Sequence, residues 1–313
     1  MDREKDNNIP KVQVLLSAYN GEKYIRTQIE SILNQDYGNI EILVRDDGSG
    51  DGTADILKEY ASAGKITCYS GLNMGVIRSF FDLFRHADPE AEFYALSDQD
   101  DEWMPEKMSA AVNRLLQMGG KGKEDIPLLY CGAQVISHED LTPIKNPVSR
   151  IVNRLSFGNA LVQNICTGCT AVFDKNLLRR LNAYEPEHAV LHDWWIYLAA
   201  SCFGQVYYDQ KAYIYYRQHG NNVYGALRNQ RQLFKYRFSQ LNKKRGRIYE
   251  QAEEFEEAFG YQMNKKNLAL TDKLLGARKS LRGKIRAASD KRLFRQKKSD
   301  NLVLKLIILT GKL

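Results

Sequence analysis

The sequence predicts an α/β protein with a mostly parallel sheet, followed by a helical carboxy-terminal extension. In the first hundred residues, short apolar runs alternate with segments whose apolar residues recur at helical spacing. This order is the one expected when parallel strands are joined by right-handed crossover helices. After about residue 222 the chain is instead polar, basic and helical in pattern. A hydrophobic content of 43% in 313 residues is enough for a packed core.

The elements of the first half can be assigned in chain order. Val12–Leu16 is a continuous apolar run, as expected for a strand that is covered on both faces. Pro105 suits the start of a helix, where its missing N–H does no harm. The other predicted elements are strands at Ile40–Val44, Lys65–Tyr69 and Phe93–Leu96, and helices over Ile25–Leu33, Thr53–Ala63, Met74–His86 and Pro105–Met118.

The second half of the chain has a more mixed pattern of strands and helices. The change to a polar, basic, helical pattern after about residue 222 suggests a division into residues 1–222 and 223–313. Strands are expected near Leu128–Ile136, Thr170–Phe173 and Val206–Arg217, with a helix across Leu191–Cys202. The later region looks helical throughout. It ends in an apolar run, Leu302–Leu309, that is too short to span a bilayer. That run could lie in a membrane interface or pack back on the protein, and the sequence leaves both open.

Charge is divided between the two halves. Residues 225–313 hold 23 Lys and Arg against 8 Asp and Glu, whereas residues 1–224 hold 22 against 30. An acidic front suits a site that collects metal ions, and a basic rear suits an anionic surface such as lipid headgroups or nucleic acid. Much of the Lys and Arg content could also simply solvate helices.

Cysteine usage and the first residues predict a reducing, cytoplasmic setting. The five cysteines are an odd number, thinly spread, and Met1–Pro10 has no apolar stretch of the signal-peptide kind. Cys166 and Cys169 have CxxC spacing, but no second CxxC or His pair accompanies them. A small-residue strand packed in the core is the favoured interpretation, ahead of a metal site.

Three polar clusters follow predicted strands, at Ser17–Gly21, Asp46–Gly50 and Ser97–Asp101. In parallel sheets, ligands bind beyond the carboxyl ends of the strands. Asp98, Asp100 and Asp101 would repel one another without a cation, and their oxygens suit Mg²⁺ or Mn²⁺ held jointly with a diphosphate. The alternative is an acidic turn that caps the following helix, for which one Asp would suffice.

The other candidate residues are weaker when taken singly. Asp47 could accept the imide N–H of uracil or thymine, although Asp-Gly is also common in Asx turns. No GxxxxGK[ST] motif occurs, which argues against a kinase or ATPase. Asp193, within His192-Asp193-Trp194-Trp195, could act as a general base or could cap a helix while the tryptophans pack. His219 lies in a polar, Gly-containing loop and could contact a metal or phosphate.

These motifs, in this order, resemble the inverting glycosyltransferases often called family 2, which have the nucleotide-binding GT-A fold. The resemblance covers about residues 11–222. The spellings SDQDDxW, HDWW and YRQHGNN most resemble bacterial rhamnosyltransferases of cell-wall and capsular polysaccharide assembly. The matching pieces are Ser17–Gly21, Asp46–Ser49 with Asp51 and Thr53, Asn73–Gly75, Ser97–Asp101 with Trp103, Thr167–Cys169 and His192-Asp193.

Carried over position by position, the resemblance implies a role for each matched residue. Ser17, Tyr19 and Asp47 would hold the nucleoside, and Asp98 would contact ribose or metal. Asp100 and His219 would contact the metal, Mn²⁺ or Mg²⁺. Asp193 matches the catalytic base, and His192, Trp194 and Trp103 would face the acceptor. The family usually has Glu before the base, so His192 puts the acceptor contacts in doubt more than the chemistry.

The resulting expectation is a metal-dependent, inverting transfer of a sugar from a nucleoside diphosphate. The expected donor is dTDP-β-L-rhamnose, with UDP-sugars as the main competitors. The expected acceptor is a lipid-linked polysaccharide at the inner membrane face, where the basic tail would bind anionic lipid. One rival is a sugar nucleotidyltransferase, which normally has a glycine-rich basic loop where this chain has Ser-Ala-Tyr-Asn-Gly. Another is a nucleic-acid-binding protein that uses Arg278–Lys298, which salt-sensitive binding would reveal.

Overall fold

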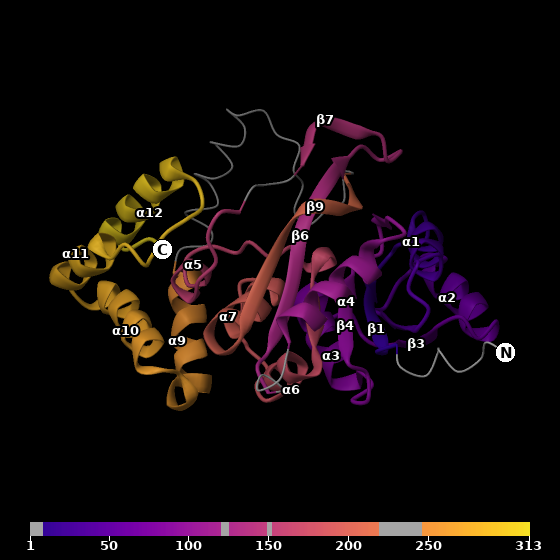
Figure 1. Ribbon diagram of the computed structural model, residues 1–313, viewed down its shortest axis with the longest axis horizontal. Helices are drawn as coiled ribbons and strands as arrows, with labels where there is room; N and C mark the ends of the chain where they lie inside the picture. Colours follow the sequence, from indigo (N-terminus) through magenta and orange to yellow (C-terminus); the bar gives the residue numbers. More distant parts are fainter. Residues whose placement is uncertain (1–8, 120–124, 149–151, 219–245) are drawn as a thin grey trace.

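The computed structural model describes residues 9–119, 125–148, 152–218 and 246–313. It confirms an α/β fold built on one curled, mostly parallel sheet with helices at the carboxy-terminal end (Figure 1). The nine strands include a path in the order β3-β2-β1-β4-β8-β6-β9-β5, and β7 pairs with β6. The sheet forms the middle of the molecule. The first strands lie toward one end of the long axis, and α9 to α12 form the other end.

The first part of the sheet is parallel, as predicted. In register, β1 pairs Val12 with Ile40 of β2 on one side and with Phe93 of β4 on the other. The strands are β1 (Val12–Ala18), β2 (Ile40–Asp46), β3 (Thr67–Ser70) and β4 (Phe93–Ser97). The helices are α1 (Ile25–Leu33), α2 (Thr53–Ser62), α3 (Gly75–His86) and α4 (Lys107–Met118). All four strands end one or two residues later than predicted, so polar residues near their carboxyl ends are still held in the sheet.

The second part of the sheet is mixed. Strand β8 (Val172–Asp174) is antiparallel to both β4 and β6 (Leu128–Ser137), whereas β6 is parallel to β9 (Gln205–Arg217). Two short strands were not predicted, β5 (Glu102–Trp103) and β7 (Pro143–Val148). The expected strand beginning at Thr170 starts later, because Gly168–Thr170 forms a 3-10 turn, η2. The remaining helices of this part are α5 (Phe157–Ala160), α6 (Lys175–Asn182) and α7 (His192–Phe203).

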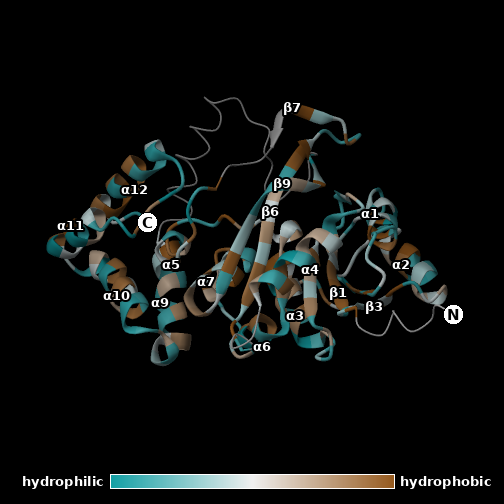
Figure 2. Ribbon diagram, viewed as in Figure 1, coloured by the Kyte–Doolittle hydropathy of each residue, from teal (hydrophilic) through white to brown (hydrophobic). Residues whose placement is uncertain are grey.

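Two apolar clusters lie on opposite faces of the sheet. One is formed by β-strand residues such as Val14 and Leu16 with Ile29 of α1 and Ala111 of α4. The other joins α3, α6 and α7 to the opposite face of the strands. Because both faces are covered, β4 is buried along its whole length and β1 along nearly all of it. Figure 2 shows brown segments on β1, whereas β6 and β9 carry pale and teal segments as well.

The carboxy-terminal helices share the second cluster with the sheet domain. They are α9 (Arg247–Phe259), α10 (Lys265–Lys279), α11 (Leu281–Ser289) and α12 (Lys298–Thr310), with a short turn η3 (Gly260–Gln262). Trp195 of α7 packs edge-on against Phe255 of α9, with ring centroids 5.2 Å apart. The predicted boundary at residue 222 lies outside the described residues, so the division into 1–222 and 223–313 stays a prediction. Within the described ranges, no helix is long and apolar enough to cross a membrane.

Candidate active site

Hydrogen bonds tie together the loops that follow β1, β2 and β4. Gln99 accepts a bond from the Tyr19 backbone N–H at 2.7 Å and returns one to the Tyr19 carbonyl at 2.8 Å. Asn20 accepts from the Gly50 N–H at 2.8 Å, and its own N–H donates to Ser49 Oγ at 2.9 Å. The three polar clusters recognised in the sequence therefore meet at one edge of the sheet.

The backbone of these loops takes conformations that the local residues allow. Asn20 has φ of +49°, in the left-handed region where Asn is tolerated. Gly48 has φ of +78°, and a Cβ there would lie 3.1 Å from both the Asn73 nitrogen and the Gly71 oxygen. Glycine at this position therefore lets the loop after β2 lie directly against the segment that enters α3.

Asp47 is buried and engaged by protein donors on both carboxylate oxygens. It pairs with Arg45, accepts from the Met74 N–H at 3.0 Å and accepts from the Gly75 N–H at 2.9 Å. Arg45 also bonds Asp82 at 2.9 Å. Asp47 thus fixes the start of α3, and an additional bond to a nucleobase would have to share or replace these partners. Its role in holding the nucleoside stays a prediction.

Two other predicted nucleoside contacts lie at the end of β1 and just after it. Ser17 Oγ is 2.7 Å from Ser79 Oγ of α3. The Tyr19 side chain is 47% exposed, while its backbone is held by Gln99. An exposed aromatic ring on a fixed backbone is suited to stacking against a base, which is consistent with the expectation for Tyr19.

The acidic loop after β4 brings carboxylates and a thiol together. Ligand atoms of Asp98, Asp101 and Cys169 lie within 4.8 Å of one another. Burial, together with the charges of Asp100 and Asp193, raises the pKa of Asp98 to about 7. Burial and the charges of Asp100 and Asp98 also raise the pKa of Asp101. The carboxylates are therefore crowded enough that a cation would relieve their repulsion.

The residues of this loop fit a divalent cation. Asp101 is fully buried, its Oδ1 accepts from the Arg217 N–H at 3.2 Å, and its Oδ2 has no N–H or O–H partner among the described residues. Asp98 is only half-buried, and the Asp100 carbonyl accepts from Arg217 Nε at 2.7 Å. Asp98 and Asp100 could hold the ion with carboxylate oxygens, which Mg²⁺ and Mn²⁺ prefer, while Asp101 anchors the loop to β9.

His219 lies outside the described residues, and its contact with metal stays a prediction. The strand that precedes it in the sequence does reach the acidic loop, because Arg217, the last residue of β9, bonds both Asp100 and Asp101.

Lys107 of α4 lies over the ring of Trp103, 3.4 Å from its centroid, and burial lowers the pKa of Lys107 to about 7.

Asp193 lies in the first turn of α7 and accepts hydrogen bonds from two donors in the segment between α5 and β8. Asn164 Nδ2 donates to Asp193 Oδ1 at 2.9 Å, and the Gly168 N–H donates to Oδ2 at 3.0 Å. These two bonds fix the orientation of the Asp193 carboxylate, with one donor on each oxygen. The charge of Asp193 also contributes to the raised pKa of Asp98, which places the two carboxylates in one electrostatic environment.

The residues expected to face an acceptor are more buried than the sequence suggested. His192 stacks on Phe80 with ring centroids 4.1 Å apart, and burial lowers its pKa to about 3. Trp194 donates from Nε1 to the Ala160 carbonyl at 2.6 Å. Trp103 is 3% exposed and belongs to the core cluster around α1 and α4. An acceptor could contact Trp103 only if this packing opened.

Several residues of the site were not singled out by the sequence. Cys169 was interpreted as part of a core strand, but it lies in the turn η2 beside the acidic loop. Gln99 is within the recognised acidic cluster, yet its role in joining two loops depends on a contact 80 residues apart. Asn164 precedes the Thr167–Cys169 motif, and only the fold shows that it holds Asp193.

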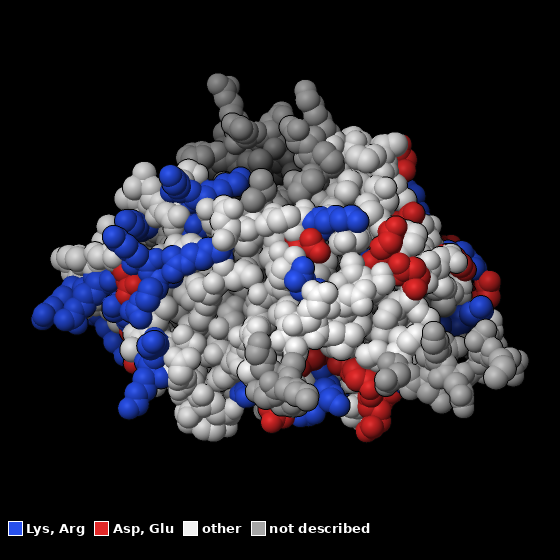
Figure 3. Space-filling view, in the orientation of Figure 1, with Lys and Arg blue, Asp and Glu red and all other residues white. Residues whose placement is uncertain are grey.

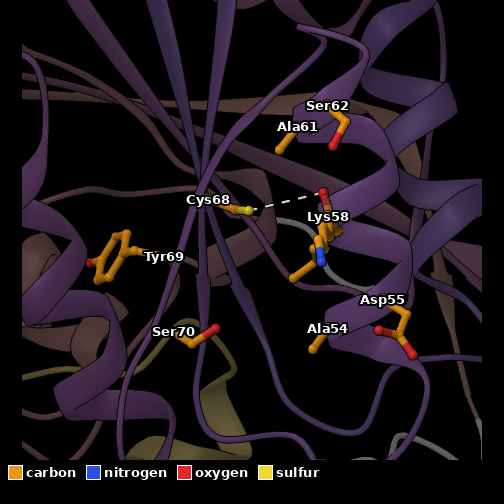
Figure 4. Close-up of a pocket in the computed structure, with 9 residues that line it drawn as sticks. Ala54, Asp55, Lys58, Ala61, Ser62, Cys68, Tyr69 and Ser70 are labelled. Atoms are coloured by element: carbon orange, nitrogen blue, oxygen red, sulfur yellow. Dashed lines mark hydrogen bonds between the residues drawn. The ribbon is translucent and has the colours of Figure 1, made fainter.

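A surface hollow of about 620 Å³ lies elsewhere, between α2 and the edge strand β3. Figure 4 shows Lys58 and Asp55 on its helical side and Cys68 and Ser70 on the strand. None of the acidic-loop residues lines it. The assignment of the site therefore depends on the convergence of the loops and not on the size of a cavity.

Comparison with known proteins agrees with this arrangement. Residues 13–120 match the model described as glycosyl transferase family 2. The dTDP-rhamnosyl transferase RfbG of Shigella flexneri is 28% identical over 223 residues, covering 67% of this chain and 74% of RfbG. UDP-Glc:alpha-D-GlcNAc-diphosphoundecaprenol beta-1,3-glucosyltransferase WfgD of Escherichia coli is 26% identical over 191 residues, covering 60% of this chain and 68% of WfgD.

Solved structures show the same fold at low identity. S. aureus TarS 1-349 in complex with UDP aligns with a TM-score of 0.56 and 18% identity, covering 96% of this chain and 80% of TarS 1-349. The mannosyltransferase PcManGT from Pyrobaculum calidifontis, in complex with GDP-Man and Mn²⁺, aligns with a TM-score of 0.53 and 18% identity. That alignment covers 98% of this chain and 86% of PcManGT. The sheet and its carboxy-terminal helices thus match those of GT-A glycosyltransferases.

Proposed function

We propose that this chain, a family 2 glycosyltransferase with a GT-A-like fold, transfers L-rhamnose from dTDP-β-L-rhamnose, with inversion, to a bacterial polysaccharide. One observation carries the assignment of the site. Ligand atoms of Asp98, Asp101 and Cys169 lie within 4.8 Å of one another, and the N–H of the adjacent Gly168 donates to Asp193 Oδ2 at 3.0 Å, so the turn η2 joins the acidic loop to Asp193. A diphosphate site and a proton acceptor in one place are what glycosyl transfer to a hydroxyl group requires.

In this proposal Asp193 takes the proton of the acceptor hydroxyl while that oxygen attacks the anomeric carbon. The new carbon–oxygen bond forms on the face opposite the diphosphate. The bond between the anomeric carbon and the diphosphate oxygen breaks, and its electron pair leaves with the nucleoside diphosphate. Asn164 and the Gly168 N–H keep the carboxylate of Asp193 in a fixed orientation for this step.

Asp98 and Asp100 would hold Mn²⁺ or Mg²⁺ together with the diphosphate. When bound, such an ion supplies positive charge to the departing phosphate. Ser17, Tyr19 and Asp47 would hold the nucleoside, and Gln99 would keep the Tyr19 loop in place against the acidic loop. Manganese with a nucleoside diphosphate sugar is present in the PcManGT complex, which supports a divalent cation here.

The donor has one serious alternative. RfbG supports dTDP-rhamnose, whereas WfgD supports a UDP-hexose, and the TarS complex with UDP supports a uridine nucleotide. The name of WfgD also includes a diphosphoundecaprenol acceptor, which supports a lipid-linked glycan as the acceptor. A lipid-linked acceptor in turn implies that the enzyme works at the inner, anionic face of the bacterial membrane.

The experiment that tests the proposal separates donor binding from transfer. The thermal midpoint of the wild-type chain is measured with Mn²⁺ and dTDP-rhamnose, UDP-glucose or GDP-mannose, since a true donor stabilises the folded form. Asp193→Asn is expected to keep that stabilisation and to lose transfer by roughly 10²–10⁴-fold, the usual contribution of a general base. Asp100→Asn is expected to lose the donor-dependent shift itself.

Asp55→Asn, on the first turn of α2, is the matched control and should retain both properties. A thermal midpoint that rises with UDP-glucose but not with dTDP-rhamnose would identify the donor as a UDP-hexose instead. Near-normal turnover by Asp193→Asn would remove Asp193 from the role of base.

A further inference from the structure

Helix α12 presents apolar side chains on two opposite sides. Leu304, Ile307 and Ile308 are buried against the rest of the protein. Leu302, Leu306 and Leu309 are 65%, 56% and 39% exposed. The exposed residues are spaced by four and three positions, so they form one stripe that faces away from the buried side. The helix therefore packs back on the protein and still leaves an apolar face uncovered.

Large exposed apolar side chains are concentrated at this end of the molecule. Among the described residues, α11 and α12 carry six of the twelve large hydrophobic side chains that are exposed. The two helices contact each other, and α11 contributes Leu281 and Ile285, which are 70% and 53% exposed and four residues apart. Scattered apolar residues are normal on a surface, but a concentration of this kind marks an interaction site.

The same region is strongly basic. Residues 278–313 include 12 Lys and Arg and only 2 Asp and Glu. One of the two acids, Asp290, is already paired with Lys273 and Arg292. Lys298 and Lys305 are exposed and lie at helical spacing from Leu302, so positive charge borders the apolar stripe. Figure 3 shows Lys and Arg gathered over α10 to α12 on the face in view.

We propose that the outer face of α12, with the exposed leucine and isoleucine of α11 beside it, lies in the interface of an anionic phospholipid bilayer. The stripe would enter the boundary between headgroups and acyl chains, and the surrounding Lys and Arg would contact lipid phosphates. Helix α12 has 13 residues, which is too short to cross the bilayer, so it would lie parallel to the surface.

A second copy of the chain is a poorer occupant of this face. Pairing two α12 stripes would bring the basic borders of both copies together, and like charges across an interface are unfavourable. An anionic bilayer complements both features, because it offers negative headgroups and an apolar layer beneath them. The inference deepens the membrane location in the proposed function, but it does not depend on the identity of the donor.

The test is co-sedimentation of the full chain with vesicles of phosphatidylcholine alone or mixed with phosphatidylglycerol. The double substitution Leu302→Ser and Leu306→Ser should weaken binding to the mixed vesicles at least tenfold, in low and high salt alike. Lys298→Glu with Lys305→Glu should weaken binding in low salt and have a smaller effect in high salt, where charge is screened. Leu116→Ser, an exposed leucine on α4, is the matched control and should bind as the wild type does.

Two results would overturn the proposal. One is unchanged vesicle binding by the leucine variant with an unchanged thermal midpoint. The other is a wild-type dimer in sedimentation velocity that the leucine substitutions convert to monomer, which would assign the face to a second copy. Transfer to a soluble acceptor is measured in parallel and should be the same for all these variants, so a failure of the proposed function is recognised separately.

Discussion

His192 and Asp193 are adjacent in the chain, but their surroundings differ. Asp193 receives hydrogen bonds from Asn164 and Gly168, whereas neither ring nitrogen of His192 has a hydrogen-bond partner among the described residues. His192 instead stacks on Phe80. The sequence could propose a base at Asp193 from its aromatic setting. It could not show that His192 turns into the core, because that depends on α3, more than a hundred residues earlier.

The burial of His192 makes a prediction about stability in acid. Its pKa is lowered to about 3 in the folded chain, below the ordinary value of about 6.5. Between these values the unfolded chain binds a proton that the folded chain does not. The free energy of unfolding should therefore fall as pH falls from 6.5 toward 3, by up to about 1.4 kcal/mol per pH unit from this residue.

Urea unfolding of the wild type and His192→Asn at several pH values between 7 and 4 measures this contribution. The variant should show a shallower loss of stability on acidification, even if it is less stable at pH 7. His188→Asn, at an exposed position, is the control and should follow the wild-type slope. Parallel slopes for the wild type and His192→Asn would contradict the assignment.

At the scale of elements, the strands and helices of the first half were predicted within a few residues. Their apolar runs and helical spacing are local features that the tertiary structure does not override. The short strands β5 and β7 and the turn η2 were not predicted, since β5, for example, consists of two residues that pair with β9 across the chain. Pairing of this kind has no local signal.

The hydrogen bonds of Gln99 join the loop after β4 to the loop after β1, and their loss should weaken donor binding. Gln99→Ala removes both hydrogen bonds to Tyr19, so the Tyr19 loop should lose its fixed position beside the acidic loop. Each such bond contributes about 0.5–1.5 kcal/mol, and we expect donor affinity to fall roughly tenfold. Calorimetric titration of the wild type and Gln99→Ala with the nucleoside diphosphate and Mn²⁺ measures this loss of affinity.

Gln117→Ala, an exposed position on α4, is the control and should bind normally. If Gln99→Ala binds the nucleotide as tightly as the control, the loop after β1 does not depend on Gln99 for its position.

At the scale of the whole molecule, the sequence predicted the division of charge and the helical extension. It did not predict how extensively the carboxy-terminal helices pack on the rest of the protein. The sequence left open whether the apolar run at Leu302–Leu309 docks on protein or meets a membrane. The structure shows one side of α12 docked and the other exposed. Apolar residues occur on both sides of the helix, so a simple amphipathic pattern could not distinguish the two uses.

This packing predicts that the last helices cannot be removed cleanly. Deleting residues 280–313 would remove Leu304 and Ile308 from the main apolar cluster and break the bond from Asn159 Nδ2 to the Phe294 carbonyl, 2.8 Å long. We expect a lower thermal midpoint by several degrees or aggregation, because the surface left behind is apolar.

Thermal unfolding followed by circular dichroism measures this loss. The double substitution Leu302→Ser and Leu306→Ser is the comparison, and it should keep the wild-type midpoint because those side chains are already exposed. A deletion that unfolds at the wild-type temperature would show that α11 and α12 are an appendage and not part of the fold.

Helix α7 runs between Asp193, the proposed proton acceptor, and the apolar cluster that the carboxy-terminal helices share. Asp193 is in its first turn, while Phe203 at its other end packs against Phe255 and Phe259 of α9. A helix of 12 residues is a rigid rod about 18 Å long. With the extension seated on lipid, Asp193 would stay at a constant height above the bilayer. Only glycans whose growing end reaches that height would be extended. The distance between the membrane-bound helices and Asp193 would then select acceptors by their length.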